Sequence, residues 1–348
     1  MLTQVPDQPV KHPPSITGAK CQTSLSVSVD YLRVILPIFR SEYTLEALDL
    51  LFKDYLSLAL NFSENIPYCC GRKFAHGHRS FDNTCILGYN WNTEDTGEAI
   101  ITISGSSLAR LSLDRMHSFF KDLHSLAARC TRIDIALDDF TKSYFNYERL
   151  QETVQAGNFT GARPESYSCK LDGNAGWLVT IGKRSNSVFR RFYNKSVESK
   201  GQIDSNRFET EYKHEHSRTI YDSICTLDLD SVLDFISKLI CGSVDFIDRS
   251  LGVRAARCPR LPWWEDFINI MGGVICWSVP RLVRTIEKTI KWVEKQVSSS
   301  LAVISECKGI HWFKNWLEKS IDVGHRRFKS SHLNRIENHF LEKRYTPT

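Results

Sequence analysis

The chain has 348 residues and a formal net charge of +5, and its 42% hydrophobic and 11% aromatic content is ordinary for a globular protein. No run approaches the roughly 18 to 20 apolar residues that a membrane-spanning helix needs. The polar, proline-bearing stretch over residues 1–22 does not resemble a secretory signal. These features argue against a membrane or secreted protein, and we expect residues 1–22 to be a flexible arm.

Eleven cysteines are scattered without a CxxC pair. An odd number of cysteines and no secretion signal predict reduced thiols in a cytoplasm. Most of them are expected to be small buried apolar side chains. Cys69, Cys70, His76 and His78 are the only group dense enough for a zinc site, and we regard this as the less favoured interpretation.

The positive charge is concentrated at the end of the chain. Residues 308–348 contain nine Lys or Arg and four acids, so this segment carries the whole surplus and the remainder is neutral. A neutral body with a basic tail is typical of a protein that binds a polyanion, although a solvated polar surface gives the same count.

Strict alternation over 24–31 predicts a half-buried strand, with Leu25, Val27, Val29 and Tyr31 on one face. A helix is predicted over 44–60. Further strands are expected at 85–89, 98–104, 131–140, 177–182, 188–194 and 207–213, with helices at 111–128 and 147–156. Beyond about residue 225 only helical spacing remains. This order predicts an α+β fold, a mostly antiparallel sheet with flanking helices over 23–225, followed by a helical, basic C-terminal domain over 226–348.

A helix after Pro280 is the clearest predicted element of the second part. Its apolar residues recur every three or four positions from Leu282 to Ile304, which gives one apolar stripe. A basic stripe has the same spacing: Arg281, Arg284, Lys288, Lys291 and Lys295. Such a helix would lie along a phosphate backbone, although a basic face that is merely solvated is the commoner outcome.

Charged residues interrupt three of the predicted strands. In the first, Asp134 and Asp138 share a face, and Ile133, Ile135 and Leu137 take the opposite, core face. Two carboxylates roughly 6.5 to 7 Å apart along a strand repel each other unless a cation binds both. Mg²⁺ or Mn²⁺ suits that role. A solvent-facing acidic strand end is the alternative, and Asp139 is a weaker ligand because it has the opposite parity.

The second strand has Tyr193 between Arg191 and Lys195 on one face. A tyrosine phenol has an unperturbed pKa near 10. Flanking cations would favour the phenolate and would also hold a phosphate, which is an arrangement suited to phosphoryl transfer. Taken alone, a tyrosine in a strand is usually there for packing.

The third strand has Arg207, Glu209, Glu211 and Lys213 on one face. Glu209 would complete a carboxylate metal site with Asp134 and Asp138. A ladder of ion pairs between strands explains the same residues equally well. What favours the functional interpretation is that acids, a cation-flanked tyrosine and another acid all occur on one parity of three separate strands.

The motifs on these strands resemble those of a known family. The order RIDIALDD, VTIGKRSNSVFRRFYNKSVES and RFETEYK, preceded by ILGY and ITISGSSLARL, resembles the replication initiation factor family over about residues 85–225. That family includes plasmid rolling-circle initiators, relaxases of some integrative elements and initiators of filamentous phages. The C-terminal run EKTIKWVEKQVSSSLAVI is most similar to the filamentous-phage branch.

The resemblance implies that Tyr193 is the nucleophile, with Arg191 and Lys195 beside it, and that the metal ligands are Asp134, Asp138 and Glu209. Tyr193 would nick one strand at a replication origin, leaving a 5′ phosphotyrosine and a free 3′ hydroxyl, and a second transfer would rejoin the strand. No second tyrosine lies at short spacing on a helix, so we expect one nucleophile per chain. The paired His76 and His78 lie far upstream of the tyrosine and lack apolar flanks, so they are not taken as metal ligands.

Several partners follow from the same resemblance. We expect duplex and single-stranded origin DNA, a host helicase and a host polymerase as partners, no membrane, and a location in the cytoplasm of a bacterial host; a homodimer is left open. The expected DNA contacts are Arg207, Lys213, Arg284, Lys288, Lys291, Lys295, Arg326, Arg327 and Lys329. Two alternatives remain, a conjugative relaxase with the same chemistry and a non-catalytic regulator that binds an origin.

Overall fold

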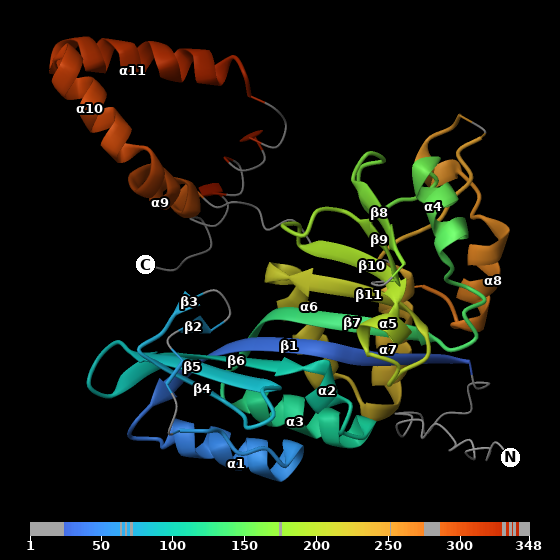
Figure 1. Cartoon of the computed structure of the whole chain (residues 1–348). Coiled ribbons are helices and arrows are strands. Elements are labelled where there is room, and N and C mark those ends of the chain that lie inside the picture. The colour runs from blue at the N-terminus through green and yellow to red at the C-terminus, as the bar shows by residue number, and fades with distance from the viewer. Residues whose placement is uncertain are drawn as a thin grey trace, which may run out of the picture. The chain divides into compact units, whose positions relative to one another are not determined.

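A computed structural model gives the structure of the chain (Figure 1), and it describes residues 24–62, 65–66, 68–69, 72–173, 176–250, 252–274 and 286–328, with a few single positions between 332 and 340. The predicted arm at 1–22 lies outside the described residues. The chain forms two compact units, Met1–Val279 and Pro280–Thr348, and each is considered by itself.

A nine-stranded antiparallel sheet is the centre of the first unit, in the order β4-β5-β6-β1-β7-β11-β10-β9-β8. This arrangement confirms the predicted fold class. The strands are β1 (Leu25–Phe39), β4 (His76–Arg79), β5 (Cys85–Trp91), β6 (Thr96–Ser104), β7 (Arg129–Asp139), β8 (Tyr167–Asp172), β9 (Gly176–Ile181), β10 (Val188–Asn194) and β11 (Asn206–Lys213). A separate hairpin pairs β2 (Tyr68–Cys69) with β3 (Arg72–Lys73).

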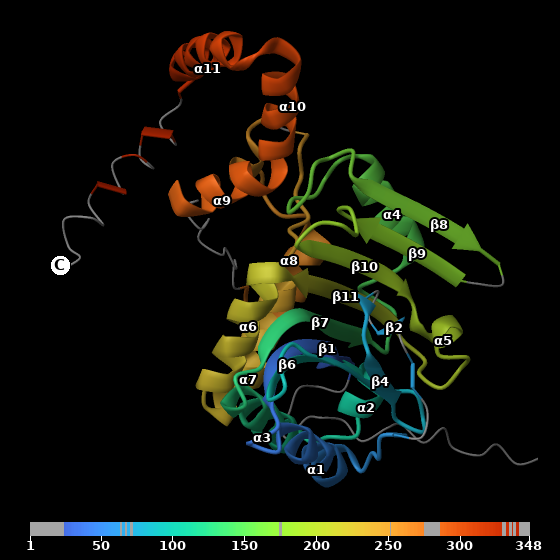
Figure 2. The same cartoon turned by 90° about the vertical axis from the view of Figure 1, so that its left-hand side faces the viewer.

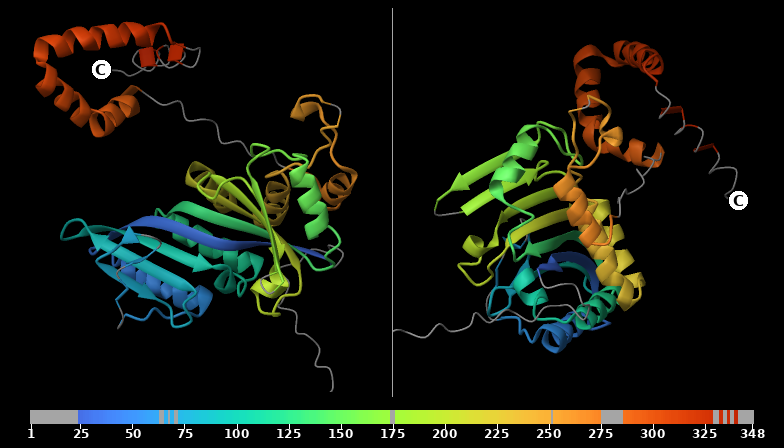
Figure 3. Two further views of the ribbon diagram at one scale, coloured as in Figure 1. Left: turned by 45° about the horizontal axis from the view of Figure 1, so that its top comes forward. Right: turned by 90° about the vertical axis from the view of Figure 1, so that its right-hand side faces the viewer.

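The long helices cover one face of this sheet (Figure 2, and Figure 3 from two further sides). The helices of the first unit are α1 (Thr44–Leu56), α2 (Gly105–Leu108), α3 (Leu113–Ser125), α4 (Tyr147–Gln155), α5 (Lys195–Glu198), α6 (His214–Thr226), α7 (Leu229–Cys241) and α8 (Pro262–Ile270), with a 3₁₀ turn at Ala255–Arg257. On this face Ile133, Ile135 and Leu137 are fully buried, as their parity predicted. The opposite face of the central strands therefore carries the charged residues.

The boundary expected at residue 225 is not where the compact units divide. Helices α7 and α8 belong to the first unit, whose contacts continue to Val279. Trp264 and Phe267 of α8 are fully buried, and their rings lie against those of Phe208 and Phe145. The end of the strand pattern was a poor marker of the boundary, because helices that follow the last strand still complete the core of the sheet.

The second unit consists of α9 (Ile286–Gln296), α10 (Ser298–Lys308) and α11 (Ile310–His325). The single long helix expected after Pro280 is interrupted at Val297, so the apolar stripe is divided between α9 and α10. Lys291, Lys295, Arg326 and Arg327 are exposed, whereas Arg284, Lys329 and the side chain of Lys288 lie outside what the structure describes.

Neither α10 nor α11 has a buried residue within this unit. The rings of Trp312 and Trp316 stack on each other with centroids 6.1 Å apart. Among the helices that the structure describes, none combines the length and the apolar character that crossing a bilayer would require.

We predict that Trp264→Ala lowers the free energy of unfolding of the first unit by about 3 to 5 kcal/mol, because it leaves a large cavity beneath the sheet. The indole also loses its hydrogen bond from Nε1 to Asp245, a contact of 2.9 Å. Urea denaturation followed by circular dichroism measures the change. Trp292→Ala is the matched control, since that side chain is 55% exposed and its loss should cost less than about 0.5 kcal/mol. Equal effects of the two variants would contradict this account of the core.

Candidate active site

The strand register arranges the charged face of the sheet in rows. Residues directly opposite one another on neighbouring antiparallel strands place their side chains on the same face. One row contains Asp138, Arg207 and Tyr193; the next contains Ala136, Glu209 and Arg191; then follow Tyr31, Asp134, Glu211 and Phe189; the last contains Arg33, Arg132 and Lys213. The predicted catalytic and acidic residues are therefore brought together from β7, β10 and β11.

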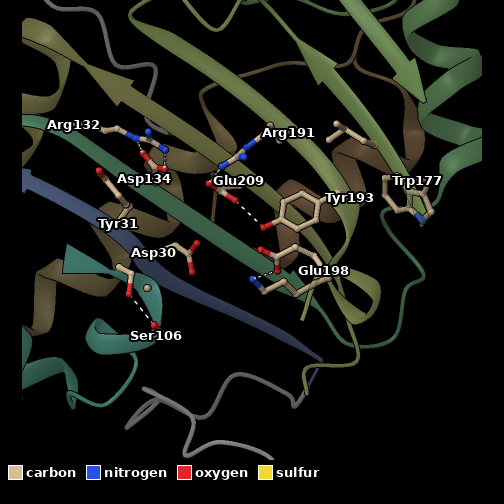
Figure 4. A pocket seen from close by; sticks show the side chains of 14 residues that line it. Asp30, Tyr31, Ser106, Arg132, Asp134, Trp177, Arg191, Tyr193, Glu198 and Glu209 are labelled. Carbon is tan, nitrogen blue, oxygen red and sulfur yellow. Dashed lines mark hydrogen bonds and ion pairs between the residues drawn. The ribbon is translucent and has the colours of Figure 1, made fainter. Parts of the chain in front are cut away.

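A cavity of about 530 Å³ lies on this face (Figure 4). Five of the six residues predicted for catalysis and metal binding line it: Arg191, Tyr193, Lys195, Asp134 and Glu209. The sixth, Asp138, does not. Asp30, Tyr31, Arg132 and Trp177 complete much of the wall. Its volume lies in the range typical of small-ligand sites, and the charged lining suits a polar substrate.

Tyr193 and Glu209 form a hydrogen-bonded pair in this cavity. The Tyr193 hydroxyl donates to Glu209 Oε2 over 2.8 Å, and Arg191 donates to the other carboxylate oxygen. Burial raises the pKa of Tyr193 well above its usual value, and the charge of Glu209 raises it further. The expected preference for a phenolate is therefore wrong for the free site, because the cations do not outweigh burial and the adjacent carboxylate.

The pKa of Glu209 is shifted in the opposite direction. Burial alone would raise the pKa of this carboxyl, but Arg191 and the Tyr193 hydroxyl together lower it below its usual value. The pair thus consists of a protonated phenol and an ionised carboxylate in direct contact, which is a geometry suited to proton transfer from the phenol.

Asp134 is held by Arg132 through contacts of 2.9 Å from Nε and 2.5 Å from Nη2. Burial raises the pKa of Asp134 to about 7, with Glu209 and Glu211 adding to the shift and Arg132 opposing it. Arg132 also lies 2.9 Å from Glu211, and Lys213 lies 2.6 Å from the same carboxylate. The ion-pair ladder that the sequence allowed is therefore present at this end of the site.

Asp138 is paired with Arg207 instead of facing the cavity. The guanidinium contacts both Asp138 oxygens, at 2.9 and 2.7 Å, and a third nitrogen lies 2.7 Å from Asp30. Arg207 is only 4% exposed, so its geometry does not fit the predicted contact with DNA. Lys213 likewise pairs with Glu211 and donates to the carbonyl of Arg184.

Asp30 is a cavity residue that the sequence reasoning missed. The register of β1 against β7 shifts between Val29 and Tyr31, so Asp30 lies in a β-bulge. Tyr31 consequently lies opposite Asp134 on the cavity face, and its expected place on the face of Val29 is wrong. A signal was available, because the alternating apolar residues change parity between Val29 and Leu32.

Gly105 lies directly against this bulge. A Cβ at this position would be 2.3 Å from Asp30 Oδ1 and 2.6 Å from the Asp30 carbonyl oxygen. Only glycine therefore allows α2 to approach β1 this closely.

Within the described ranges, no three His, Cys, Asp or Glu side chains meet as a ready-made metal site. The discounted His76 stacks on Tyr89, with ring centroids 4.8 Å apart. Four carboxylates line the cavity, those of Asp30, Glu198, Asp134 and Glu209, and their donor type suits Mg²⁺ or Mn²⁺. The two that the sequence predicted as metal ligands are Asp134 and Glu209. Both carboxylates are held by arginines, so an ion would compete with Arg132 and Arg191.

Comparison with known proteins places the chain in a family. A model of the replication initiation factor family matches residues 128–321, which is more than half of the chain. The chain belongs to this family. A solved rolling-circle replication initiator protein from Geobacillus stearothermophilus is similar to it in fold, with 21% identity and a TM-score of 0.53 over 72% of this chain and 98% of that one.

The regulatory subunit of aspartate kinase from Thermus thermophilus is 6% identical over 59% of this chain and 97% of that one, and its TM-score of 0.16 is too low to indicate a shared fold. No curated protein matches the sequence.

The burial of Arg207 predicts that Arg207→Met acts on stability. The change leaves Asp138 and Asp30 without their cation, and removing one partner of a buried ion pair costs about 3 to 5 kcal/mol. Thermal unfolding followed by circular dichroism measures the loss. Arg218→Met is the control, because Arg218 pairs with Glu215 on the surface of α6. A stable Arg207→Met protein with a changed salt dependence of DNA binding would instead identify Arg207 as a DNA contact.

Proposed function

We propose that this replication initiation factor nicks one strand of an origin through Tyr193 and so starts rolling-circle replication. The observation that carries the proposal is the contact between the Tyr193 hydroxyl and Glu209, inside a cavity that also contains Arg191 and Lys195. A nucleophile, its base and two cations for a phosphate are the parts that a transesterification at phosphorus needs.

In the proposed reaction Glu209 accepts the phenolic proton as the Tyr193 oxygen attacks the phosphorus atom. The bond between phosphorus and the 3′ oxygen breaks, and this oxygen leaves with the bonding electrons and takes up a proton from solvent. A 5′ phosphotyrosine and a 3′ hydroxyl result. Arg191 and Lys195 stabilise the negative charge that develops on the phosphoryl oxygens. A host polymerase would extend the 3′ hydroxyl behind a host helicase, and a second transfer would close the displaced strand.

A divalent metal ion is part of the proposal. The cavity-facing ligands that would hold it are Asp134 and Glu209. The crowding of Asp134 with the carboxylates of Glu209 and Glu211 is an arrangement that a bound cation would relieve. When bound, the ion would neutralise charge on the phosphate.

The two alternatives differ in what supports them. A relaxase would use the same residues at a transfer origin, and the structure gives no reason to prefer it. A non-catalytic regulator would not need a tyrosine hydrogen-bonded to an ionised carboxylate within a cavity, so the Tyr193–Glu209 pair favours an enzyme.

Tyr193→Phe is expected to lower formation of the covalent DNA adduct by about 100-fold or more while leaving origin binding intact, because it removes only the attacking oxygen. Glu209→Gln should lower the rate of nicking by about 100-fold or more, because it removes both the base and one of the two proposed metal ligands. Labelled single-stranded origin DNA, incubated with Mn²⁺ and separated on a denaturing gel, reports both changes. Tyr212→Phe is the control, since Tyr212 is buried on the helix-covered face. Adduct formation at the wild-type rate in Tyr193→Phe would remove Tyr193 from the mechanism.

Asp134→Asn is expected to abolish binding of Mn²⁺, measured by isothermal titration calorimetry, because the amide cannot neutralise a cation. Asp138→Asn should keep that binding, since Asp138 is turned to Arg207 outside the cavity. The opposite result for the two variants would transfer the metal site to Asp138.

We further propose that the second unit contributes duplex affinity through its exposed cations. Arg326→Glu with Arg327→Glu should make the slope of log affinity against log salt shallower by about 1.8, if each residue neutralises one phosphate. Fluorescence anisotropy with duplex origin DNA measures the slope. Lys53→Glu with Lys121→Glu changes the net charge equally on exposed helix surfaces of the first unit and should leave the slope unchanged. Equal slopes for the two doubly substituted proteins would exclude this role of the second unit.

A further inference from the structure

Helix α11 of the second unit carries two tryptophans that the proposed nicking reaction does not use. Trp312 and Trp316 are four residues apart, so their side chains are neighbours on one side of the helix. Their rings are nearly parallel, with an interplanar angle of 8° and centroids 6.1 Å apart. Trp312 is 45% exposed and Trp316 is partly exposed. Two parallel indoles therefore follow one another along α11, and both are accessible to a ligand.

The distance between the two rings is close to what an unpaired base requires. Consecutive bases in one DNA strand are about 3.4 Å apart, so a base between two parallel rings separates the rings by about 6.8 Å. The centroids of the indoles lie 6.1 Å apart, which is slightly less. A small rotation about a side-chain bond of either exposed tryptophan makes up the difference. A planar ligand can therefore enter between the rings.

Cations accompany the two indoles. The Lys308 ammonium lies 5.7 Å from the centre of the Trp312 ring, within the range of a cation–π interaction. Lys319 is exposed and follows Trp316 by three residues, so it lies on the same side of α11. Over residues 310–328 there are four Lys or Arg and two acids. Aromatic rings interleaved with positive charge are typical of surfaces that bind single-stranded nucleic acid.

Aliphatic side chains form a separate strip on α11. Ile310, Leu317 and Ile321 recur at helical spacing and are between 36% and 52% exposed. A second protein chain would be expected to cover this strip, and a lipid surface would take up the aliphatic and aromatic side chains alike. Neither occupant requires two parallel rings at nearly the spacing of a base. The geometry of the indoles therefore favours nucleic acid.

We propose that Trp312 and Trp316 bind an unpaired base of single-stranded DNA between their rings, with Lys308 and Lys319 on the adjacent phosphates. Every base has a π face, so the site accepts any sequence, but it excludes bases that are already stacked within a duplex. This role is distinct from the duplex affinity proposed for Arg326 and Arg327, and it does not depend on nicking by Tyr193. A strand displaced from an origin offers such unpaired bases.

The test compares two fluorescent tracts on the full-length protein, one of about 16 thymidines and one of equally many abasic sites with the same phosphates. Fluorescence anisotropy in the presence of EDTA measures both affinities. Neither tract contains a nick site, so nicking takes no part in the measurement. We expect the wild-type protein to bind the thymidine tract at least about five-fold more tightly than the abasic tract.

Trp312→Leu with Trp316→Leu should remove this preference by weakening only the binding of thymidine, since leucine favours a helix but offers no ring for stacking. Trp312→Tyr with Trp316→Tyr should keep most of the preference, because a phenol ring also stacks on a base. Trp292→Leu is the matched control. That tryptophan is 55% exposed on α9, and its loss should change neither affinity.

Three results would overturn the proposal. A preference for thymidine that persists in the double leucine variant would exclude the two indoles as a base-binding site. An equal loss of affinity for both tracts would mean that the indoles support α11 without contacting bases. An unchanged preference, with loss of a dimer in light scattering or of binding to phosphatidylglycerol vesicles, would assign the indoles to a second copy or to a lipid surface. A failure of nicking in the separate adduct assay would leave this proposal intact.

Discussion

The contact between Arg207 and two aspartates holds three neighbouring strands of the site together. Arg207 comes from β11, Asp138 from β7 and Asp30 from the bulge of β1, and all three groups are shielded from water to different degrees. Buried charges are tolerated only when they are paired, so this contact fixes where the strands can place their other side chains. Arg191 with Glu209 and Arg132 with Asp134 repeat the arrangement nearer the cavity. Tyr31 and Tyr193 are therefore surrounded by a network of ion pairs, and removing one member of a pair would leave its partner without a counter-charge.

The division of the sheet into an apolar and a charged face explains why much of the architecture was predictable. Alternation along β7, β10 and β11 shows which residues point together, whatever the order of the strands. The sequence therefore indicated that Tyr193, Glu209 and Asp134 share a face. It could not indicate that Asp138 turns to Arg207, because a cross-strand partner depends on register, which no local pattern specifies.

The other features that the sequence did not predict also have physical causes. Asp30 escaped notice because a single inserted residue reverses parity, and the regular alternation before it concealed the change. The raised pKa of Tyr193 depends on burial, which charge counting around a tyrosine does not include. The position of α8 beneath the sheet depends on packing between segments that are distant in sequence, such as Trp264 and Phe208.

The bulge in β1 makes strand length part of the site. If Asp30 were deleted, β1 could pair with β7 without the shift between Val29 and Tyr31. Tyr31 would then follow Val29 directly, and alternation would keep it on the cavity face opposite Asp134. A deletion of one residue would thus remove the Asp30 carboxylate from the cavity, and with it one partner of Arg207, without substituting any residue that defines the chemistry at Tyr193. In related chains, the spacing between the two apolar runs of this strand is therefore as informative as the identity of the residues within it.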